Sequence, residues 1–157
     1  SYEPLDVLQI PVPEELYCAV INPHIIVLTK DAREILPKEI PLGKSLRQSA
    51  NVGGIIVGLL RGDYDLIGRS LVDYIAEPYR SSLIPGFYEM KNAAIAAGAL
   101  GGSISGSGPS VFALCKGKET ALKAGDAMKA VMDKMGLGAD VYVSKVNSVG
   151  PKVLPLG

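Results

Sequence analysis

The sequence is poor in the side chains that most often carry enzyme chemistry. It has no tryptophan, one histidine and two cysteines among its 157 residues. A Ser-His-Asp hydrolase needs a histidine beside its serine, and His24 sits at an Asn-Pro turn with no second histidine available, so we do not expect that chemistry. No cysteine, histidine or carboxylate cluster stands near His24 at ligand spacing. We therefore interpret His24 as a surface or turn residue and expect no metal site.

The two cysteines show no pattern of a functional pair. Cys18 and Cys115 lie in apolar, strand-like segments, and neither belongs to a CxxC motif. Buried thiols of this kind are typical of a protein from a reducing compartment. We therefore expect two buried free thiols and a cytoplasmic location.

Charge imbalance and long apolar runs are also lacking. The chain has 16 basic and 16 acidic side chains, a net charge of zero, which argues against broad nucleic-acid binding or electrostatic attachment to a membrane. No uninterrupted apolar run reaches the roughly 18 residues of a membrane span. With 48% hydrophobic and 20% charged residues, the composition is that of a globular domain with a sizeable core.

Apolar periodicity and turn residues divide the chain into strands and helices. The expected strands span 16–24, 110–115 and 139–147, and 25–28 is a further short apolar run. The expected helices are a short one that Thr29 caps and that stops before Pro37, followed by 41–63, 63–78 capped by Asp63, 85–98 and 119–136. This order predicts a single α+β domain in which helices pack on one face of an antiparallel sheet.

Two of the expected helices carry further signals. The glycines at positions 53, 54 and 58 weaken helix 41–63 by propensity, so we expect them to allow close helix packing. Helix 119–136 is the clearest amphipathic segment. Its apolar stripe consists of Leu122, Ala124, Ala127, Met128, Val131, Met132 and Met135.

The stretch GGSISGSGPSVFALC, residues 101–115, is rich in glycine and serine. Its spacing excludes three known motifs. A dinucleotide fingerprint would need glycine where Val111 stands, and Ser107 lacks the flanking glycines of a nucleophile elbow. The GKS at 43–45 is not a Walker A loop, because Lys38 occupies the position of the first glycine.

Two interpretations of this stretch remain open. Glycines 101, 102, 106 and 108 would let the backbone approach an anion closely, and serines 103, 105, 107 and 110 add hydroxyl groups. A concave run of backbone N–H groups is an anion-binding nest. Alternatively, the glycines only supply the positive φ angles of a hairpin.

Four segments together resemble a known enzyme family. GALGGSISGSGPSVFALC, residues 98–115, is similar to the third signature motif of the GHMP kinases, a superfamily of small-molecule kinases. TKDAREILP at 29–37, IAEPYRSSLIPGF at 75–87 and GPKVL at 150–154 resemble the homoserine kinase family within it. The resemblance covers essentially the whole chain and implies a ferredoxin-like antiparallel sheet with helices packed on one face.

The resemblance also implies that something is missing. The PxxxGLGSSA-type loop, by which this family holds ATP, does not occur in the sequence, and the chain starts with Ser1 rather than with methionine. We therefore expect residues 1–157 to be the C-terminal domain of a protein about twice as long. ATP and Mg²⁺ are then expected to bind mainly through the N-terminal half.

The resemblance assigns roles to particular residues. Thr29, Arg33 and Arg80 are implied to contact the amino-acid substrate, L-homoserine, whose carboxylate suits the guanidinium fork of arginine. The loop made of Ser105, Gly106, Ser107 and Gly108 is implied to close the active site against the substrate and the transferring phosphate. We expect Glu77 to pair with Arg80 in a structural role, and the chain offers no evident general base.

Two alternatives stay open on the sequence. The chain could belong to another GHMP kinase with a different small alcohol as substrate, although the three substrate residues suit a carboxylate better than a sugar or an isoprenoid. It could also be a non-enzymatic ferredoxin-like module for binding or dimerisation. The partners expected on the first interpretation are L-homoserine, the chain's own N-terminal domain and a possible second copy in a homodimer, with no nucleic acid and no membrane.

Overall fold

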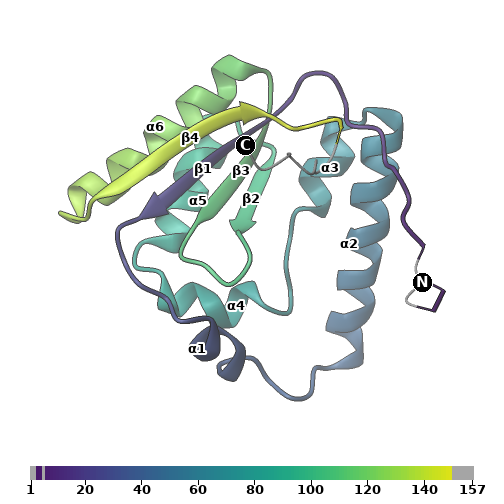
Figure 1. Cartoon of the computed structure of the whole chain (residues 1–157), viewed down its shortest axis with the longest axis horizontal. Helices are drawn as coiled ribbons and strands as arrows, with labels where there is room; N and C mark the ends of the chain where they lie inside the picture. Colours follow the sequence, from purple (N-terminus) through teal and green to yellow (C-terminus); the bar gives the residue numbers. More distant parts are fainter. Residues whose placement is uncertain (1–2, 5, 150–157) are drawn as a thin grey trace, which may run out of the picture.

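The fold is built around one four-stranded antiparallel sheet (Figure 1). The computed structural model describes residues 3–4 and 6–149. Its strands lie in the order β2-β3-β1-β4, which read from the other edge is 4-1-3-2, the order of the split β-α-β fold of ferredoxin. The prediction of a ferredoxin-like antiparallel sheet is therefore confirmed. The strands are β1 (Leu16–Pro23), β2 (Gly101–Ile104), β3 (Val111–Lys116) and β4 (Ala139–Lys145).

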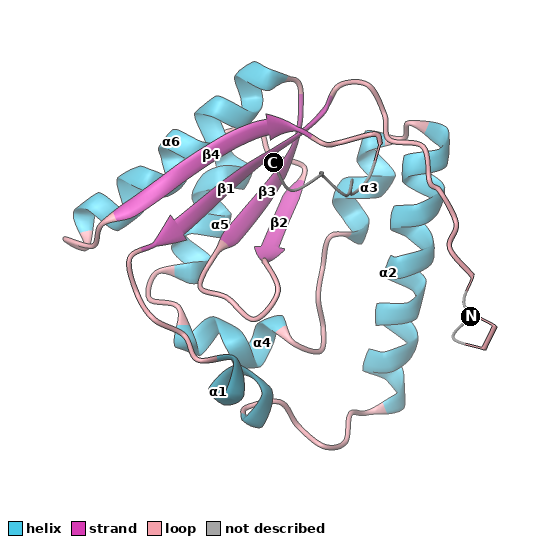
Figure 2. Cartoon of the chain, viewed as in Figure 1, coloured by secondary structure: helices cyan, strands magenta, loops and turns pink. Residues whose placement is uncertain are grey.

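Two helices cover one face of this sheet, as the pattern predicted. In β3 the side chains of Val111, Ala113 and Cys115 are buried and alternate with more exposed neighbours, because successive side chains of a strand point to opposite faces. Helices α5 (Phe87–Ala96) and α6 (Lys118–Lys134) pack on the buried face (Figure 2). The main core therefore lies between these helices and the sheet.

The predicted apolar stripe of α6 is correct in its centre and wrong at its ends. Met128 and Met132 are fully buried, but Leu122 and Met135 are 45% and 46% exposed. In its first half the helix packs through Ala124, as predicted, and through Ala121 and Gly125, which the predicted stripe did not include. A Cβ atom at Gly125 would lie 2.8 Å from Cγ1 of Val141, so the glycine lets the helix approach β4 closely.

The connection from β1 to β2 contains four further helices at the β2 edge of the sheet and below it (Figure 1). In α2 (Leu42–Arg61), Gly54 and Gly58 face Ser70 and Ile67 of α3 (Tyr64–Ser70), which confirms close helix packing for these two glycines, whereas Gly53 faces open space. These helices are α1 (Thr29–Glu34), α2 (Leu42–Arg61), α3 (Tyr64–Ser70) and α4 (Glu77–Arg80), and a 3₁₀ turn (Ser81–Leu83) follows α4.

The single helix predicted over 63–78 is wrong, because the chain forms two helices there. Asp63 caps the first helix as predicted, since its Oδ1 atom accepts a hydrogen bond from Leu66 N at 2.9 Å. That helix ends at Ser70. The carboxylate of Asp73 then accepts hydrogen bonds from the backbone N–H groups of residues 75, 76 and 77, which holds the bend that precedes α4. An aspartate that caps new N–H groups in this way interrupts a helix rather than continuing it.

The start of α1 differs from its prediction. The apolar run 25–28 that precedes it lies outside the strands, and Ile26 is 90% exposed. Thr29 is the first residue of α1 rather than its cap, and Leu28 occupies the cap position without a side-chain hydrogen bond. The helix does stop before Pro37, as expected. Within the part of the chain that the structure describes, no helix is long and apolar enough to cross a membrane.

Candidate functional site where α1, α4 and the glycine loop meet

Three segments that are distant in the sequence meet at the end of the β2–β3 hairpin (Figure 1). Arg80, the last residue of α4, donates a hydrogen bond from Nε to the carbonyl oxygen of Ala32 in α1 at 2.8 Å and another from Nη1 to the carbonyl oxygen of Gly106 at 3.1 Å. Thr29 Oγ1 lies 3.4 Å from Ser107 Oγ in the same loop. The structure thus brings together two of the three predicted substrate residues and the predicted loop.

Arg33, the third predicted substrate residue, lies on α1 with an exposed side chain. Its guanidinium makes no hydrogen bond or ion pair with the described residues. Arg80 is half-buried, and no carboxylate of residues 3–4 and 6–149 forms an ion pair with it. A guanidinium has about five N–H donors, and two of those of Arg80 are used, so about three remain for a ligand. The site therefore holds positive charge that the described protein does not neutralise.

The loop between β2 and β3 is a hairpin, as one of the two interpretations predicted. Ser105 N donates to Ser110 O at 2.8 Å and Gly108 N donates to Ser105 O at 3.1 Å, which closes the turn. Gly106 and Gly108 have φ angles of 61° and 90°, which strongly favour glycine. The backbone N–H groups of Gly106 and Ser107 have no partner in the described chain, so they are free to face an anion.

The first two glycines of the stretch have a different role, and the interpretation that all four admit an anion is wrong for them. Gly101 and Gly102 are buried in β2. A Cβ atom at Gly102 would clash with the carbonyl oxygen of Phe112 in β3, and one at Gly101 would lie 2.9 Å from Cβ of Leu71. These two glycines therefore permit close packing of the strand and leave only the other two in the loop.

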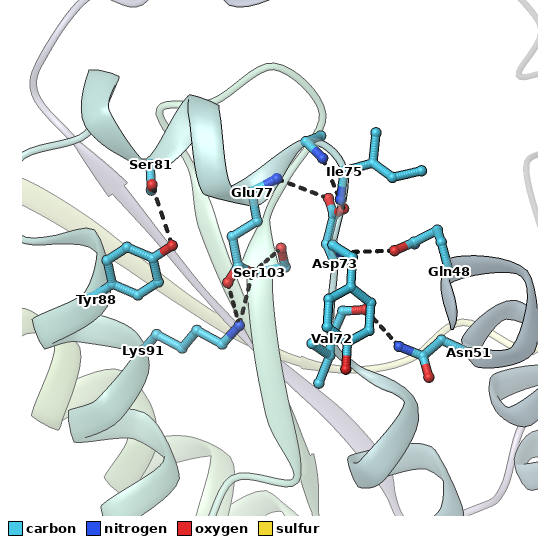
Figure 3. A network of polar contacts seen from close by, with 12 residues as sticks. Gln48, Asn51, Val72, Asp73, Ile75, Glu77, Ser81, Tyr88, Lys91 and Ser103 are labelled. Atoms are coloured by element: carbon cyan, nitrogen blue, oxygen red, sulfur yellow. Dashed lines mark hydrogen bonds and ion pairs between the residues drawn. The ribbon is translucent and has the colours of Figure 1, made fainter. Parts of the chain in front are cut away.

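The predicted pair of Glu77 and Arg80 does not form, although the two residues begin and end the same short helix. The Glu77 carboxylate accepts hydrogen bonds from Lys91 Nζ in α5 at 2.7 and 2.8 Å and from Ser103 Oγ in β2 at 2.7 Å (Figure 3). The side chains of Glu77 and Lys91 are only 7% and 13% exposed. Ser103 therefore serves this buried carboxylate instead of contributing a hydroxyl to the loop.

A second set of polar contacts ties α2 to the segment that precedes α4. Gln48 Oε1 accepts a hydrogen bond from Tyr74 N at 2.9 Å, and Asn51 Nδ2 donates one to Val72 O at 2.7 Å (Figure 3). Together with the hydrogen bonds that Asp73 accepts, these bonds hold the bend that leads into α4. A cavity of about 230 Å³ lies beside them and is lined in part by Gln48, Asp73 and Ser103.

Sequence reasoning missed Asp73, Lys91 and Ser103 as supports of this site. Glu77 binds Lys91 and Ser103 across 14 and 26 residues of sequence, and no local pattern signals such pairings. Asp73 has a local signal, because aspartate side chains often accept hydrogen bonds from backbone N–H groups two or three residues further along the chain. The GPKVL stretch at 150–154 lies outside the described residues.

The two thiols are not part of the site. Cys115 is fully buried in β3, and Cys18 in β1 is partly buried. Burial raises the pKa of Cys115 to about 11, with a smaller contribution from the charge of Cys18, and burial also raises the pKa of Cys18. High pKa values keep both groups as unreactive thiols, which agrees with the expected structural role.

Comparison with known proteins gives consistent matches. Residues 55–134 match the family model of the GHMP kinases C terminal. The chain is 52% identical over 156 residues to a homoserine kinase of Chlorobium phaeobacteroides, covering 98% of this chain and 49% of that protein. It is 41% identical to a homoserine kinase of Pyrococcus furiosus over 93% of this chain and 48% of that protein.

Solved structures show the same relationship. The crystal structure of homoserine kinase from Cytophaga hutchinsonii is similar with a TM-score of 0.93 and 58% identity, over 98% of this chain and 49% of that one. Phosphomevalonate kinase of Streptococcus pneumoniae shares the fold at a TM-score of 0.68 and 14% identity, over 90% of this chain and 43% of that one. The chain spans about half the length of the curated relatives it matches. Since the family model covers about half of the chain and the sheet has the matching topology, the chain belongs to the GHMP kinase family as one of its C-terminal domains.

Proposed function

We propose that residues 1–157 are the C-terminal domain of a homoserine kinase, which transfers the γ-phosphoryl group of ATP to the hydroxyl group of L-homoserine. The names and the 41–58% identity of the relatives described above support this substrate. The proposal extends to a whole enzyme, in which an N-terminal domain completes the active site.

The guanidinium of Arg80, which forms no ion pair within residues 3–4 and 6–149, carries the proposal. Homoserine is a zwitterion with a carboxylate, and arginine binds a carboxylate through two parallel N–H donors. Arg80 keeps free donors, is half-buried and is held in place by two carbonyl oxygens of α1 and the loop. A half-buried guanidinium that is fixed in this way suits a small anionic group better than the neutral hydroxyls of a sugar. Thr29, the first residue of α1, and Arg33, in its last turn, would complete the substrate contacts from the exposed side.

The loop of Ser105, Gly106, Ser107 and Gly108 would close over the transferring phosphate. Its free backbone N–H groups at residues 106 and 107 support this role. Phosphoryl transfer depends mainly on positioning and on stabilisation of charge, so a site of amides and arginines needs no protein nucleophile. Hydrogen-bond donors aimed at the phosphate oxygens would supply part of that stabilisation.

ATP and Mg²⁺ would bind mainly through the N-terminal domain. Residues 3–4 and 6–149 contain no group of three or more His, Cys, Asp or Glu side chains that could hold a metal ion. The ATP loop of the family is likewise not among the motifs of this chain. We propose a cytoplasmic location on the strength of the two free thiols.

A covering partner is also part of the proposal. Leu42, Leu46 and Leu60 on α2 are 73%, 62% and 56% exposed, and such apolar side chains are usually buried. We propose the enzyme's own N-terminal domain as the main partner of this chain. That two copies of the protein form a homodimer stays a separate prediction.

The test is a substrate comparison with the full-length protein that contains this chain. We expect ATP-dependent phosphorylation of L-homoserine, which ³¹P NMR detects as the phosphorylated product. 3-Aminopropan-1-ol, which is homoserine without its carboxylate, should be a far poorer substrate. Turnover of mevalonate without turnover of homoserine would identify a different small-molecule kinase, and no turnover of any alcohol would favour the non-enzymatic module.

A further inference from the structure

We propose that Glu77, which is buried, and its partly buried partners Lys91 and Ser103 form a positioning cluster that fixes Arg80 and the glycine loop relative to each other. This inference rests on the proposed function, because it concerns how the substrate site is kept in shape. None of the three side chains needs to touch the substrate for it to hold. They act through the two elements that carry the substrate contacts.

The cluster joins three elements through one carboxylate. Lys91 Nζ in α5 lies 2.7 Å from one oxygen of Glu77 and 2.8 Å from the other, and Ser103 Oγ in β2 lies 2.7 Å from Oε2. Hydrogen bonds between charged groups at these distances are stronger than hydrogen bonds between neutral groups. Figure 3 shows all three side chains converging between α4, α5 and β2. A displacement of α4 would therefore strain three bonds at once.

Stability alone does not explain a charged pair at this position. The side chains of Glu77 and Lys91 are 7% and 13% exposed, so both charges have lost most of their hydration. Well-packed apolar residues often stabilise a protein as much as a buried ion pair does, or more. What such a pair adds is a defined geometry. Helix α4 needs this, because it has four residues and cannot form a stable helix by itself.

The geometry fixed by the cluster is that of the site. Glu77 and Arg80 are the first and last residues of α4. Contacts that fix Glu77 therefore also fix the backbone position from which the Arg80 side chain extends. Ser103 is in β2, which leads directly into the loop that begins at Ser105. Arg80 then binds the carbonyl oxygen of Gly106 in that loop. One buried carboxylate thus connects both sides of the contact, and small errors in such positions reduce catalysis strongly.

The test uses the full-length protein and the substitution Glu77→Gln. Glutamine keeps the shape and can still accept from Ser103, but it leaves the buried ammonium of Lys91 without its counter-charge. We expect the KM for L-homoserine to rise about tenfold while the KM for ATP stays within about twofold. Glu119→Gln is the matched control, because Glu119 also pairs with a lysine, Lys123, but on the exposed surface of α6. That variant should leave both KM values unchanged.

A second comparison separates positioning from general damage. In an Arg80→Ala background, Glu77→Gln should change the KM for homoserine no further, because the cluster acts through Arg80. Lys91→Arg, which retains the charge, should recover most of the affinity that Lys91→Met loses. If Glu77→Gln does not fold, Ser103→Ala removes a single bond of the cluster and should raise the KM for homoserine about threefold.

Two results would overturn the inference. One is an unchanged KM for homoserine in folded Glu77→Gln protein. The other is the same increase in KM with and without Arg80. Inactivity of the unaltered protein toward homoserine would instead overturn the proposed function, and this inference with it. An active enzyme that is indifferent to Glu77 would overturn this inference alone.

Discussion

Arg80→Ala is the substitution that tests the proposed substrate site most directly. It removes the guanidinium that links α1 to the glycine loop, and with it the donors that would bind the homoserine carboxylate. The expected result in the full-length enzyme is a large loss of kcat/KM for homoserine. The KM for ATP should change little, because the proposed ATP site lies in the other half of the enzyme.

The size of the effect follows from the contacts. A hydrogen bond to a charged group contributes about 1.5–3 kcal/mol, and a bidentate pair has two of them. Water recovers part of this in the half-open site, so we expect a net loss of about 3 kcal/mol in transition-state binding. With about 1.4 kcal/mol for each tenfold change, kcat/KM for homoserine should fall about 100-fold. Arg80→Lys keeps the charge but not the fork, and should fall about tenfold.

Steady-state kinetics with a coupled ADP assay would measure these values at a temperature at which the variants are folded. Arg61→Ala is the control, since Arg61 is an exposed arginine at the far end of α2. It should leave kcat/KM for homoserine unchanged. If Arg80→Ala retains kcat/KM within threefold of the unaltered enzyme, the carboxylate argument is refuted. An equal loss for homoserine and for 3-aminopropan-1-ol would refute it as well.

Three further predictions concern the chain itself. Residues 1–157 alone should not phosphorylate homoserine, and turnover by the purified chain would contradict the proposed division of the site. Gly102→Ala should lower the free energy of unfolding by about 3 kcal/mol through overpacking against Phe112 O, whereas Gly53→Ala, in open space within α2, should raise it by up to about 1 kcal/mol; urea denaturation measures both. The pKa of Cys115 is raised from 9.0 to about 11, so the unfolded chain loses this proton first. The free energy of unfolding should therefore fall between about pH 9 and 11, by at most about 3 kcal/mol, and a Cys115→Ala variant should lack this part of the pH dependence.

The sheet and its two covering helices were predictable because their signals are local. Strand β3 shows the two-residue alternation of a half-buried strand, and α6 shows helical spacing of small and apolar residues. Both patterns arise because each element buries one face and exposes the other, so the spacing of apolar residues in the sequence follows the geometry of the element. The predicted apolar stripe of α6 is wrong at its ends. Whether Leu122 and Met135 are buried depends on how far the core extends along the helix, which the local sequence does not indicate.

The helix boundary at Ser70 was not predictable from periodicity. Leu71, Tyr74 and Ile75 continue the helical spacing of α3, so the pattern alone extends that helix. The hydrogen bonds that Asp73 and Gln48 accept decide otherwise, because they satisfy the backbone N–H groups of residues 74–77 outside a continuous helix. A side chain 26 residues away thus selects the local structure.

The partner of Glu77 shows the same limit within the candidate site. On sequence, Arg80 is the nearest opposite charge and stands at a spacing that favours ion pairs on a helix. Burial decides against that pair, since Glu77 points into the protein toward Lys91 and Ser103 while Arg80 points to α1 and the loop. The consequence is functional: an Arg80 neutralised by Glu77 would have little charge to offer a substrate. Among the described residues Arg80 has no carboxylate partner, because the neighbouring carboxylate of Glu77 binds Lys91 and Ser103 instead.

The glycine stretch connects this arrangement to the core. Gly102 allows β2 to lie close against β3, and the next residue is Ser103, which binds Glu77. Two residues later the loop begins, and its Gly106 carbonyl receives Arg80. The distance between β2 and β3 therefore determines the position of Ser103. Ser103 in turn helps to determine the position of α4 and of Arg80. A substitution that widens β2 from β3 should for this reason weaken substrate binding as well as stability, although no atom of Gly102 lies in the loop.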